Sequence, residues 1–411
     1  MKKRVLIHSL IFSPDGVSTA YLYNDIALML QERGYEVVVL TTTPHFNIVP
    51  EQVAKQPMRW KVWGLCKVSD FHGMRVLHVP QKKFKSTALR MLGFVYWHFV
   101  SFFIGLSIRH VDLILSPSPP LTIGLLNLWL ARLKGCKVVY NVQEIYPDIL
   151  KLKGGVALKV LRWMERKVYK ESDVVTTIDK VFYDTIVGRF EEPSRLHIIP
   201  NFVDTELYHE VSGFKFQDSS LFPETDSIKL LYAGNIGHAQ SWEPLVELAD
   251  KTRELDVEYF VIGEGAKREY VAAEKERRGL EKLHLLPYQR RELMPAILSY
   301  SDVSFIFMAS ESDMDGFPSK VYTIMACERP LLVLSGEGTP IVNFLKDKGC
   351  AKLITEQDFG KKVDEMASWL RSVTKEELRA MGSCGLAEIQ ANYTKERVTD
   401  MYVDLIDTLT K

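Results

Sequence analysis

The stretch KLLYAGNIG, residues 229–237, decides the fold that this sequence predicts. Its first five residues are mostly apolar, and a glycine-bounded turn and a helical pattern follow them at once. A strand that runs through a glycine turn into a helix is the repeating unit of a parallel α/β sheet. The chain already shows this unit from its start, so residue 229 marks the point where the pattern begins a second time.

Short apolar runs that alternate with helical patterns lie on both sides of this point. Before it, strands are predicted at residues 5–12, 36–41, 112–116, 137–140, 174–177 and 197–199. From it onward, strands are predicted at residues 229–233, 258–262, 284–286, 303–307 and 330–334. We therefore predict two Rossmann-like, doubly wound parallel-sheet domains that face a cleft, with ligands bound beyond the carboxyl ends of the strands.

Length and composition agree with two folded domains. The chain has 411 residues, too many for one ordinary core, and Pro200, Gly213 and Pro223 mark a linker. Its net charge is zero, but residues 1–200 carry 27 Lys and Arg against 16 Asp and Glu, and the remainder is acidic by the same amount. Either the basic half faces an anionic surface, or charge simply differs between the two lobes.

The cysteines and the N-terminus bear on the cellular compartment. The five cysteines form no CxxC pair and are odd in number, which favours reduced thiols in a cytoplasmic protein. The N-terminal run MKKRVLIHSLIF leads into SPDG rather than into a small-residue cleavage site, so we interpret it as a first strand and expect no export signal.

Three glycine-bearing turns follow predicted strands and are candidates for binding an anion. They contain Gly16, then Gly234, Asn235 and Gly237, then Gly263 and Gly265. Glycine lets backbone amides approach a phosphate, and the N-terminus of a following helix adds a favourable dipole. None of the turns is GxGxxG and none carries the lysine of a P-loop, so each alone is also compatible with an ordinary turn.

The run DMDGFPSKVYTIMACERP, residues 313–330, carries the strongest indication of chemistry. Gly316 gives backbone freedom, Pro318 suits a helix start, and Ser319 can cap that helix. Lys320 then projects from the first turn, where free amides and a cation would meet on one phosphate. The alternative is a capped helix with a surface lysine.

This run resembles the donor-binding segment of retaining GT-B glycosyltransferases of family four, EGFxxxxxExMAxGxP. The matching residues are Asp315, Gly316, Phe317, Met325, Ala326 and Pro330. IPNFVD at residues 199–204, LYAGNIG at 231–237 and VIGEG at 261–265 resemble family segments in the same order. The tail, residues 393–409, resembles the helix that crosses back to the first domain. The resemblance implies an N-terminal domain of residues 1–205 plus 392–411 and a donor domain of residues 206–391.

Within the family, Pro318-Ser319-Lys320 and EIYPD at residues 144–148 are most similar to bacterial cell-surface polysaccharide enzymes of the fucosamine-transferase-like group. That resemblance implies transfer from a nucleotide-diphosphate sugar, for which we expect UDP rather than GDP, to a polyprenyl-diphosphate-linked saccharide of O-antigen, capsule or exopolysaccharide. It implies no cofactor and no nucleic acid.

The sequence departs from the family at two places. Thr323 stands where the family has its ribose-binding glutamate, and a hydroxyl binds a ribose more weakly than a carboxylate. The family's basic residues after the glycine turn are absent, and Asn235 and His238 stand there instead. Lys320, helped by Arg290 or Arg291, would then neutralise the leaving diphosphate.

The implied reaction needs stabilisation of negative charge on the diphosphate, which backbone amides and a lysine supply without a metal. We therefore predict Lys320 and Asp315 in the donor site and expect no metal, although Asp313 and Asp315 have the DxD spacing that a metal site would use. Glu144, at a strand end, is predicted either to orient or deprotonate the acceptor hydroxyl or to cap the following helix.

Residues 82–110 are predicted to meet a membrane. Lys82, Lys83 and Lys85 precede an apolar, aromatic run over residues 88–110. A span would separate strands of one sheet, so the run is either a buried helix or one in the membrane interface, held by Tyr96 and Trp97. We expect a peripheral protein on the inner face of the cell membrane.

Two other functions remain open. A non-hydrolysing nucleotide-sugar 2-epimerase shares the tandem fold and would need no acceptor. A non-catalytic donor-binding partner of another transferase would fit Thr323 and the missing arginine.

Overall fold

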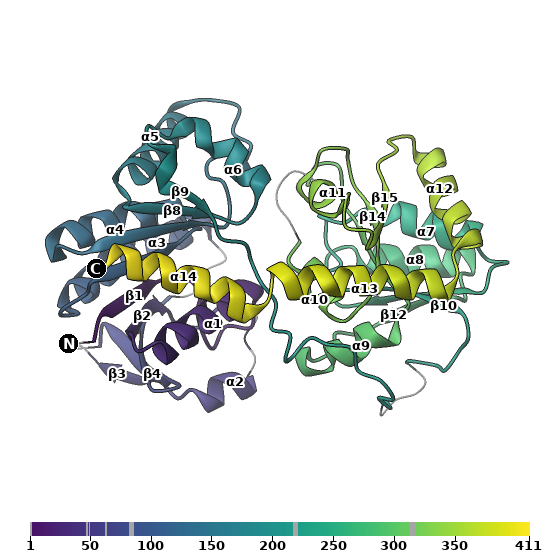
Figure 1. Ribbon diagram of the computed structural model, residues 1–411, viewed down its shortest axis with the longest axis horizontal. Coiled ribbons are helices and arrows are strands. Elements are labelled where there is room, and N and C mark those ends of the chain that lie inside the picture. Colours follow the sequence, from purple (N-terminus) through teal and green to yellow (C-terminus); the bar gives the residue numbers. More distant parts are fainter. Residues whose placement is uncertain are drawn as a thin grey trace. The chain divides into compact units, whose positions relative to one another are not determined.

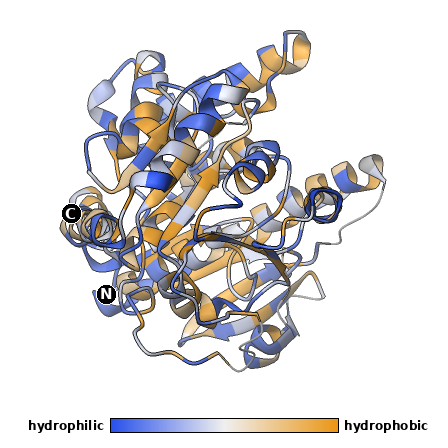
Figure 2. Ribbon diagram, turned by 90° about the vertical axis from the view of Figure 1, so that its right-hand side faces the viewer, coloured by the Kyte–Doolittle hydropathy of each residue, from blue (hydrophilic) through white to orange (hydrophobic). Residues whose placement is uncertain are grey.

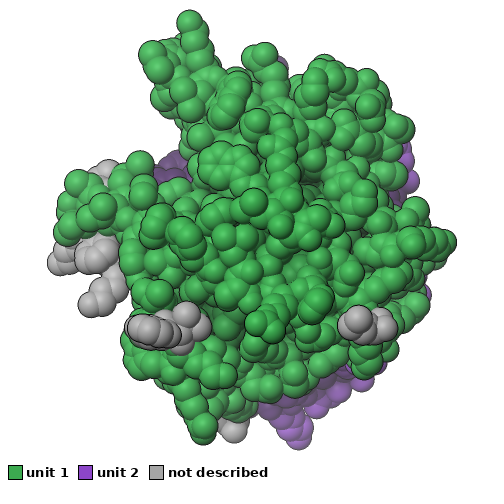
Figure 3. Space-filling model, turned by 90° about the vertical axis from the view of Figure 1, so that its left-hand side faces the viewer, with its two compact units in different colours: residues 1–201, 395–411 green, residues 202–394 purple. Residues whose placement is uncertain are grey.

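The computed structural model describes residues 2–46, 48, 50–61, 64–81, 86–216, 221–312 and 318–411. The chain divides into two compact units, residues 1–201 with 395–411 and residues 202–394. They are drawn in green and purple in Figure 3. The boundaries expected from the sequence, 205/206 and 391/392, lie within four residues of these.

The first unit is built on a nine-stranded sheet with the order β3-β4-β5-β2-β1-β6-β7-β8-β9 (Figure 1). From β5 to β9 all neighbouring strands are parallel. The strands are β1 Arg4–His8, β2 Glu36–Thr42, β3 Arg59–Lys61, β4 Cys66–Phe71, β5 Met74–Val79, β6 Leu113–Pro117, β7 Lys137–Val142, β8 Val174–Thr177 and β9 Leu196–Ile198.

The sequence did not predict the β3–β4–β5 part, in which the neighbouring strands are antiparallel. β3 and β4 are short and largely half-exposed or exposed, and Arg75 and His78 interrupt the apolar residues of the buried β5, so these strands lack the continuous apolar runs of the central strands. The first strand also ends at His8, before the predicted end at residue 12, because the chain turns away from the sheet there.

Helices cover both faces of this sheet. On one face α3 packs on α4 and α4 on α5, and their inward side chains share one core with the strands. On the other face α1 contacts α14, the C-terminal helix. The helices are α1 Ser18–Glu32, α2 Pro50–Lys55, α3 Thr87–Ser107, α4 Leu121–Lys134, α5 Val156–Glu171, α6 Lys180–Ile186 and α14 Lys395–Leu409.

A buried polar network fixes α14 on the sheet. The side-chain amide of Asn141, on β7, donates to the hydroxyl of Tyr402 at 3.0 Å and to the hydroxyl of Thr176 at 2.8 Å. Its oxygen accepts from the hydroxyl of Tyr23 on α1 at 2.5 Å. Each group is buried, so the network holds α1 and α14 in one register on the sheet. This confirms the predicted return of the C-terminal helix to the first domain.

The second unit is a six-stranded parallel sheet with the order β12-β11-β10-β13-β14-β15. Alternate residues of its strands, such as Leu230 and Leu231, belong to two separate cores, so both faces are covered, and the strands are drawn mostly in the hydrophobic colour (Figure 2). The strands are β10 Ile228–Ala233, β11 Val257–Ile262, β12 Leu283–Leu286, β13 Val303–Phe307, β14 Leu331–Leu334 and β15 Ala351–Ile354. The helices are α7 Glu243–Lys251, α8 Arg268–Arg278, α9 Met294–Tyr300, α10 Lys320–Ala326, α11 Pro340–Leu345, α12 Phe359–Ser372 and α13 Lys375–Asn392.

The Asn141 network predicts a stability effect. Tyr402→Phe leaves one buried N–H of Asn141 without a partner, which should lower the free energy of unfolding by about 1–3 kcal/mol. Urea denaturation followed by circular dichroism measures the change. The control is Tyr96→Phe, which removes an exposed hydroxyl of the same unit and should change the free energy of unfolding by less than about 0.5 kcal/mol. Equal stability of Tyr402→Phe and the wild type would contradict the role of the network.

Candidate functional site

The strand order of the second sheet reverses between β10 and β13: β11 and β12 lie on one side of β10, and β13, β14 and β15 lie on the other. Ligands of open α/β sheets bind beyond the carboxyl ends of the strands at such a point. Two predicted segments meet there: the turn that begins at Gly234 after β10, and the start of α10 beyond β13. Asp315, Gly316 and Phe317, predicted as donor-binding residues, lie outside the described residues.

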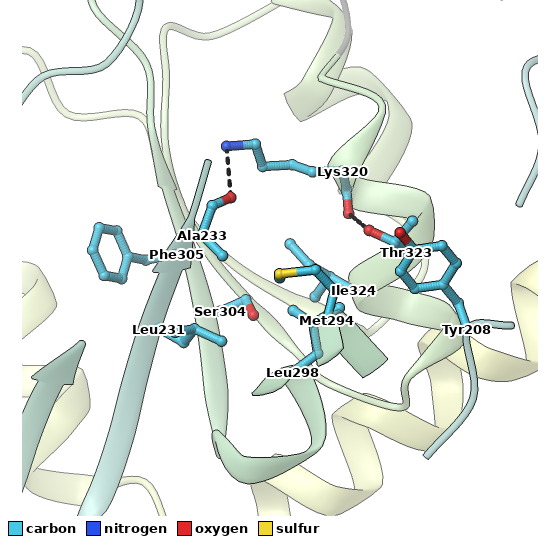
Figure 4. Close-up of a pocket in the computed structure, with 10 residues that line it drawn as sticks. All are labelled: Tyr208, Leu231, Ala233, Met294, Leu298, Ser304, Phe305, Lys320, Thr323 and Ile324. Atoms are coloured by element: carbon cyan, nitrogen blue, oxygen red, sulfur yellow. Dashed lines mark hydrogen bonds between the residues drawn. The ribbon is translucent and has the colours of Figure 1, made fainter. Parts of the chain in front are cut away.

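Lys320 is the first residue of α10 and reaches across to the end of β10 (Figure 4). Its Nζ donates to the carbonyl oxygen of Ala233 at 3.4 Å and lies 3.9 Å from the centre of the Tyr232 ring. An aromatic face attracts an ammonium ion, so Tyr232 helps to hold the charge in place. A Cβ at position 234 would come within 2.7 Å of Nζ, which means that Gly234 leaves the room for this ammonium.

The charge of the Lys320 ammonium is not compensated within the part of the chain that the structure describes, which leaves out residues 313–317. No described carboxylate forms an ion pair with it, and burial lowers its pKa to about 8 because a charge is costly where water is excluded. A diphosphate placed beside Nζ would supply the missing negative charge. Lys320 is therefore suited to bind an anion at the carboxyl end of β10.

The Gly234 and Gly263 turns pass so close that they exclude side chains. The backbone of Gly263, at the end of β11, has a φ of 139°, and a Cβ there would overlap the carbonyl oxygen of Gly234. Gly265 has a φ of 156°, and a Cβ there would lie 2.3 Å from the carbonyl oxygen of Ile236. The backbone amide of Ile236 donates to the carbonyl of Glu264 at 2.8 Å. The backbones of the two predicted glycine turns thus pack directly against each other.

Side chains fix the remainder of the Gly234 turn. The hydroxyl of Tyr232 donates to the carbonyl of Asn235 at 2.7 Å, and the indole of Trp242 donates to the carbonyl of Gly237 at 2.9 Å. Asn235 and His238 are exposed at this edge of the sheet. The structure therefore brings Gly234, Asn235, Gly237, His238, Gly263, Gly265 and Lys320 to one edge of the second unit.

Thr323 and a small cavity lie beneath this edge. The Thr323 hydroxyl donates to the carbonyl of Lys320, one turn earlier in α10, at 2.9 Å. Thr323 also lines a cavity of about 50 Å³, together with Lys320 and eight mainly apolar residues (Figure 4). Such a volume holds only one or two water molecules, so a nucleotide would have to bind outside it.

The predicted cap of α10 at Ser319 is wrong, and the two predicted helper arginines, Arg290 and Arg291, differ in their surroundings. Ser319 does not cap α10 through its side chain; its backbone is already helical, with φ −57° and ψ −22°, and Pro318 precedes it. Arg290 is exposed at the start of a short 3₁₀ turn, whereas the Nε of Arg291 donates to the Tyr208 hydroxyl at 3.4 Å.

Tyr232 and Arg268 are site residues that the sequence analysis did not identify. The Nε of Arg268, the first residue of α8, donates to the carbonyl of Gly263 at 3.1 Å. Arg268 thus adds a cation beside the glycine turns. It takes the place of the family's basic residues, which this chain lacks after residue 237. Its position three residues after Gly265 could have indicated this; for Tyr232 nothing in the sequence pointed to a contact with Lys320.

In the first unit, the loop after β7 carries Glu144. Burial raises the pKa of its carboxyl group, which makes the carboxylate a better base. The backbone carbonyl of Glu144 accepts from the Ser118 hydroxyl at 3.4 Å, which links this loop to the end of β6. Gly16 lies after β1, where its backbone amide donates to the carbonyl of Phe46 at 3.4 Å.

Glu144 is not a helix cap. The turn that follows, η1 (Asp148–Leu150), begins after Pro147 and has no side-chain cap. Asp148 instead pairs with Arg162 and with Arg189, the latter at 2.6 Å, and both arginines also pair with the buried Glu165. This four-charge cluster holds the loop that bears Glu144 against α5.

The structure divides the predicted membrane-facing stretch into two faces. Trp97 is completely buried and packs 5.3 Å from the His8 ring, so its predicted role in a membrane interface is wrong. Val100 and Ile104 are buried with it, whereas Met91, Val95 and Phe99 are exposed. A helix that connects two strands of one sheet must bury one stripe of side chains against that sheet. Because residues 88–110 are apolar on all sides, the sequence did not reveal which stripe of the helix is buried. Lys82, Lys83 and Lys85 lie outside the described residues.

Comparison with known proteins gives the same division of the chain. Residues 19–201 match the model of the glycosyl transferase 4-like domain, and residues 214–382 match that of the glycosyl transferases group 1. The chain is 24% identical over 345 residues to a protein of Escherichia coli K12 whose name is that of a colanic acid biosynthesis glycosyl transferase, WcaI. That match covers 79% of this chain and 81% of the relative.

Solved structures share the fold at lower identity. Sucrose-phosphate synthase from Thermosynechococcus elongatus has a TM-score of 0.74 and 13% identity, with 99% of each chain covered. HepE from Anabaena, solved in complex with UDP, has a TM-score of 0.72 and 11% identity, with 99% of this chain and 100% of HepE covered.

The pKa of Lys320 predicts how binding of UDP depends on pH. If UDP binds only the charged lysine, the Kd should rise about eightfold between pH 7.5 and pH 9, because the ammonium loses its proton above a pKa of about 8. Isothermal titration calorimetry measures this change. Lys320→Arg keeps its charge over the whole range, so its Kd should stay nearly constant. A Kd of the wild type that does not change with pH would remove Lys320 from the binding site.

The close approach of the turns predicts an asymmetry between two glycines. Gly263→Ala should lower the free energy of unfolding by about 3 kcal/mol or more, because the new Cβ meets backbone that cannot move. Gly237→Ala is the matched control, since its Cβ would meet only the Asn235 side-chain amide, at 2.7 Å, which can rotate. Urea denaturation compares the two, and equal losses would contradict the close packing.

Proposed function

Because the chain is a glycosyltransferase with the GT-B fold, we propose that it transfers a sugar from a UDP-sugar to a polyprenyl-diphosphate-linked saccharide. The reaction retains the anomeric configuration, needs no metal ion and contributes to a cell-surface polysaccharide such as O-antigen, capsule or exopolysaccharide. The name of WcaI supports the polysaccharide, and the complex of HepE supports the uridine nucleotide. The observation that carries the proposal is the buried Lys320 ammonium at the point where the strand order of the second sheet reverses, with no ion pair to any described carboxylate.

Lys320 stabilises the leaving group in this proposal. When the bond between the anomeric carbon and the diphosphate oxygen breaks, the electron pair stays on the diphosphate. A fixed ammonium and backbone amides stabilise that charge without reorganising, which is the main source of catalysis in such sites. Tyr232 and the Ala233 carbonyl hold Nζ in position before the donor arrives.

Further donors of the same unit complete the diphosphate site. Arg268 beside Gly263 is the second cation, and His238 and Arg290 are exposed side chains that a bound nucleotide sugar recruits. The segment with Asp315, Gly316, Phe317 and Ser319 contributes backbone amides, as in the family it resembles, whereas Pro318 has no N–H to donate. Thr323 contributes to ribose binding only weakly, because its hydroxyl already donates to the Lys320 carbonyl.

Glu144 acts on the acceptor. Its carboxylate orients the attacking hydroxyl and takes its proton while the oxygen bonds to the anomeric carbon on the face that the diphosphate leaves. The raised pKa of Glu144 supports this role, and the Asp148 cluster keeps the loop in one conformation.

The acceptor requires access to a membrane, which α3 gives. Its segment Ala88–Ser107 is long and apolar enough to cross a bilayer. Yet it connects β5 and β6 of one sheet and buries Trp97, Val100 and Ile104 against that sheet. We therefore propose that its exposed apolar face lies in the interface of the inner leaflet and that the protein is peripheral on the cytoplasmic side.

Lys320→Ala tests the function. Turnover of UDP-sugars with lipid extract as acceptor, measured as UDP release, should fall about 10²–10³-fold in the variant. A screen of UDP- and GDP-sugars with the wild type identifies the donor first. Arg371→Ala, which removes an exposed ion pair with Glu254, is the control and should keep full turnover. Unchanged turnover by Lys320→Ala would exclude the proposed mechanism.

The same assay separates the alternatives. A transferase releases UDP only when the acceptor is present. A 2-epimerase would convert the donor to its epimer without acceptor, and a non-catalytic donor-binding subunit would bind UDP but turn over nothing.

A further inference from the structure

Exposed apolar side chains gather on α5, the helix that follows the Glu144 loop. Val156, Val160 and Trp163 are spaced by four and three residues, so they form one stripe along the first half of the helix. Val156 is 79% exposed and Trp163 is 54% exposed. Leu150 and Leu152, just ahead of the helix, are exposed as well. Large apolar groups concentrated in this way indicate a surface that is covered in the working protein.

The same segment is strongly basic. Residues 151–171 contain seven Lys and Arg and only two acidic residues, Glu165 and Glu171. Both acidic side chains are engaged in ion pairs, Glu165 with Arg162 and Arg189, and Glu171 with Arg132 and Lys167. Lys151, Lys153 and Lys159 are exposed beside the stripe. An apolar stripe with cations at its sides, and a tryptophan among its members, fits the interface of an anionic bilayer.

The topology places this stripe and the exposed start of α3 at the same end of one sheet. The strands β5 and β7 are parallel members of one sheet, so α3 and α5, which follow them, both begin at its carboxyl edge. Both helices contact α4. Met91 and Leu92 of α3 are more than half exposed, as Val156 is on α5. One membrane can therefore contact both helices at the same edge of the sheet.

We propose that the first half of α5, with Leu150 and Leu152, is a second element that enters an anionic membrane surface, and that it holds the Glu144 loop at that surface. The proposal rests on the lipid-linked acceptor of the proposed function. The link to the loop is direct: Arg162, next to Trp163 on α5, pairs with Asp148, four residues after Glu144. Movement of α5 relative to the lipid would thus move the loop with it.

The test is flotation with vesicles of phosphatidylglycerol and phosphatidylcholine. Val156→Ser/Val160→Ser/Trp163→Ser should lower the partition coefficient of the protein at least fivefold, because three side chains that enter the interface are removed. Lys151→Gln/Lys153→Gln/Lys159→Gln should weaken binding only to the anionic vesicles. Trp60→Ser is the matched control. Trp60 is 58% exposed on β3, the outermost strand at the far end of the sheet from β9, and its loss should change binding less than twofold.

Three results would overturn the proposal. They are binding of the α5 variant equal to the wild type, absence of vesicle binding by the wild type, and self-association that the α5 variant abolishes, which would assign the stripe to a second copy of this chain. Because all three α5 positions are exposed, the variant should keep the circular dichroism spectrum of the wild type.

Activity in detergent separates this proposal from the proposed function. With acceptor in detergent micelles, the α5 variant should turn over as fast as the wild type, whereas with acceptor in vesicles it should be at least fivefold slower. A wild type without turnover in micelles would refute the proposed function and leave the vesicle-binding result to decide on α5. Equal slowing in micelles and in vesicles would assign α5 to folding of the acceptor loop and refute the membrane contact.

Discussion

The donor edge of the second unit depends on how closely two turns approach each other. Gly234 and Gly263 end neighbouring strands, and the backbone of one occupies the volume that a side chain of the other would need. This approach leaves room for the Lys320 ammonium above Gly234 and brings the Gly263 carbonyl to Arg268. A change of one methyl group there would shift both cations, so the chemistry of the edge rests on packing of backbone rather than on flexible side chains.

The electrostatic design follows from that packing. Lys320 lies between a carbonyl oxygen and a tyrosine ring and pairs with none of the described carboxylates, and its burial lowers its pKa. Arginine would bring a larger, planar group into the same space, and a carboxylate partner would compete with a diphosphate for the ammonium. Elsewhere in the chain, the Asp148 and Glu165 cluster shows the opposite solution, in which every charge is neutralised and the result is rigidity.

The sequence predicted what depends on local pattern. The central strands, the glycine turns and the return of the C-terminal helix follow from apolar runs, turn residues and family resemblance. The strands β3 to β5 and β15 did not, because β3, β4 and β15 are largely half-exposed or exposed and Arg75 and His78 interrupt the apolar run of β5. The buried side of α3 was not predictable either. Trp97 and Phe99 are both aromatic residues in the same apolar run, and only the packing of the helix on the sheet makes one buried and the other exposed. Tyr232 takes its role from α10, which approaches from elsewhere in the chain, a relation that no spacing in the sequence records, whereas the position of Arg268 just after the Gly265 turn could have indicated its role.

The place of α14 has a consequence for how the chain is made. Tyr402 completes a network whose other members, Tyr23, Asn141 and Thr176, leave the ribosome some 220 residues or more earlier. Domains usually fold in the order of their synthesis, but here the face of the first sheet that receives α14 stays open until residues 395–409 have been made. The second unit has its residues complete before the first one does. A nascent chain of this architecture therefore presents an apolar sheet face to the cell for most of its synthesis, where chaperones would act.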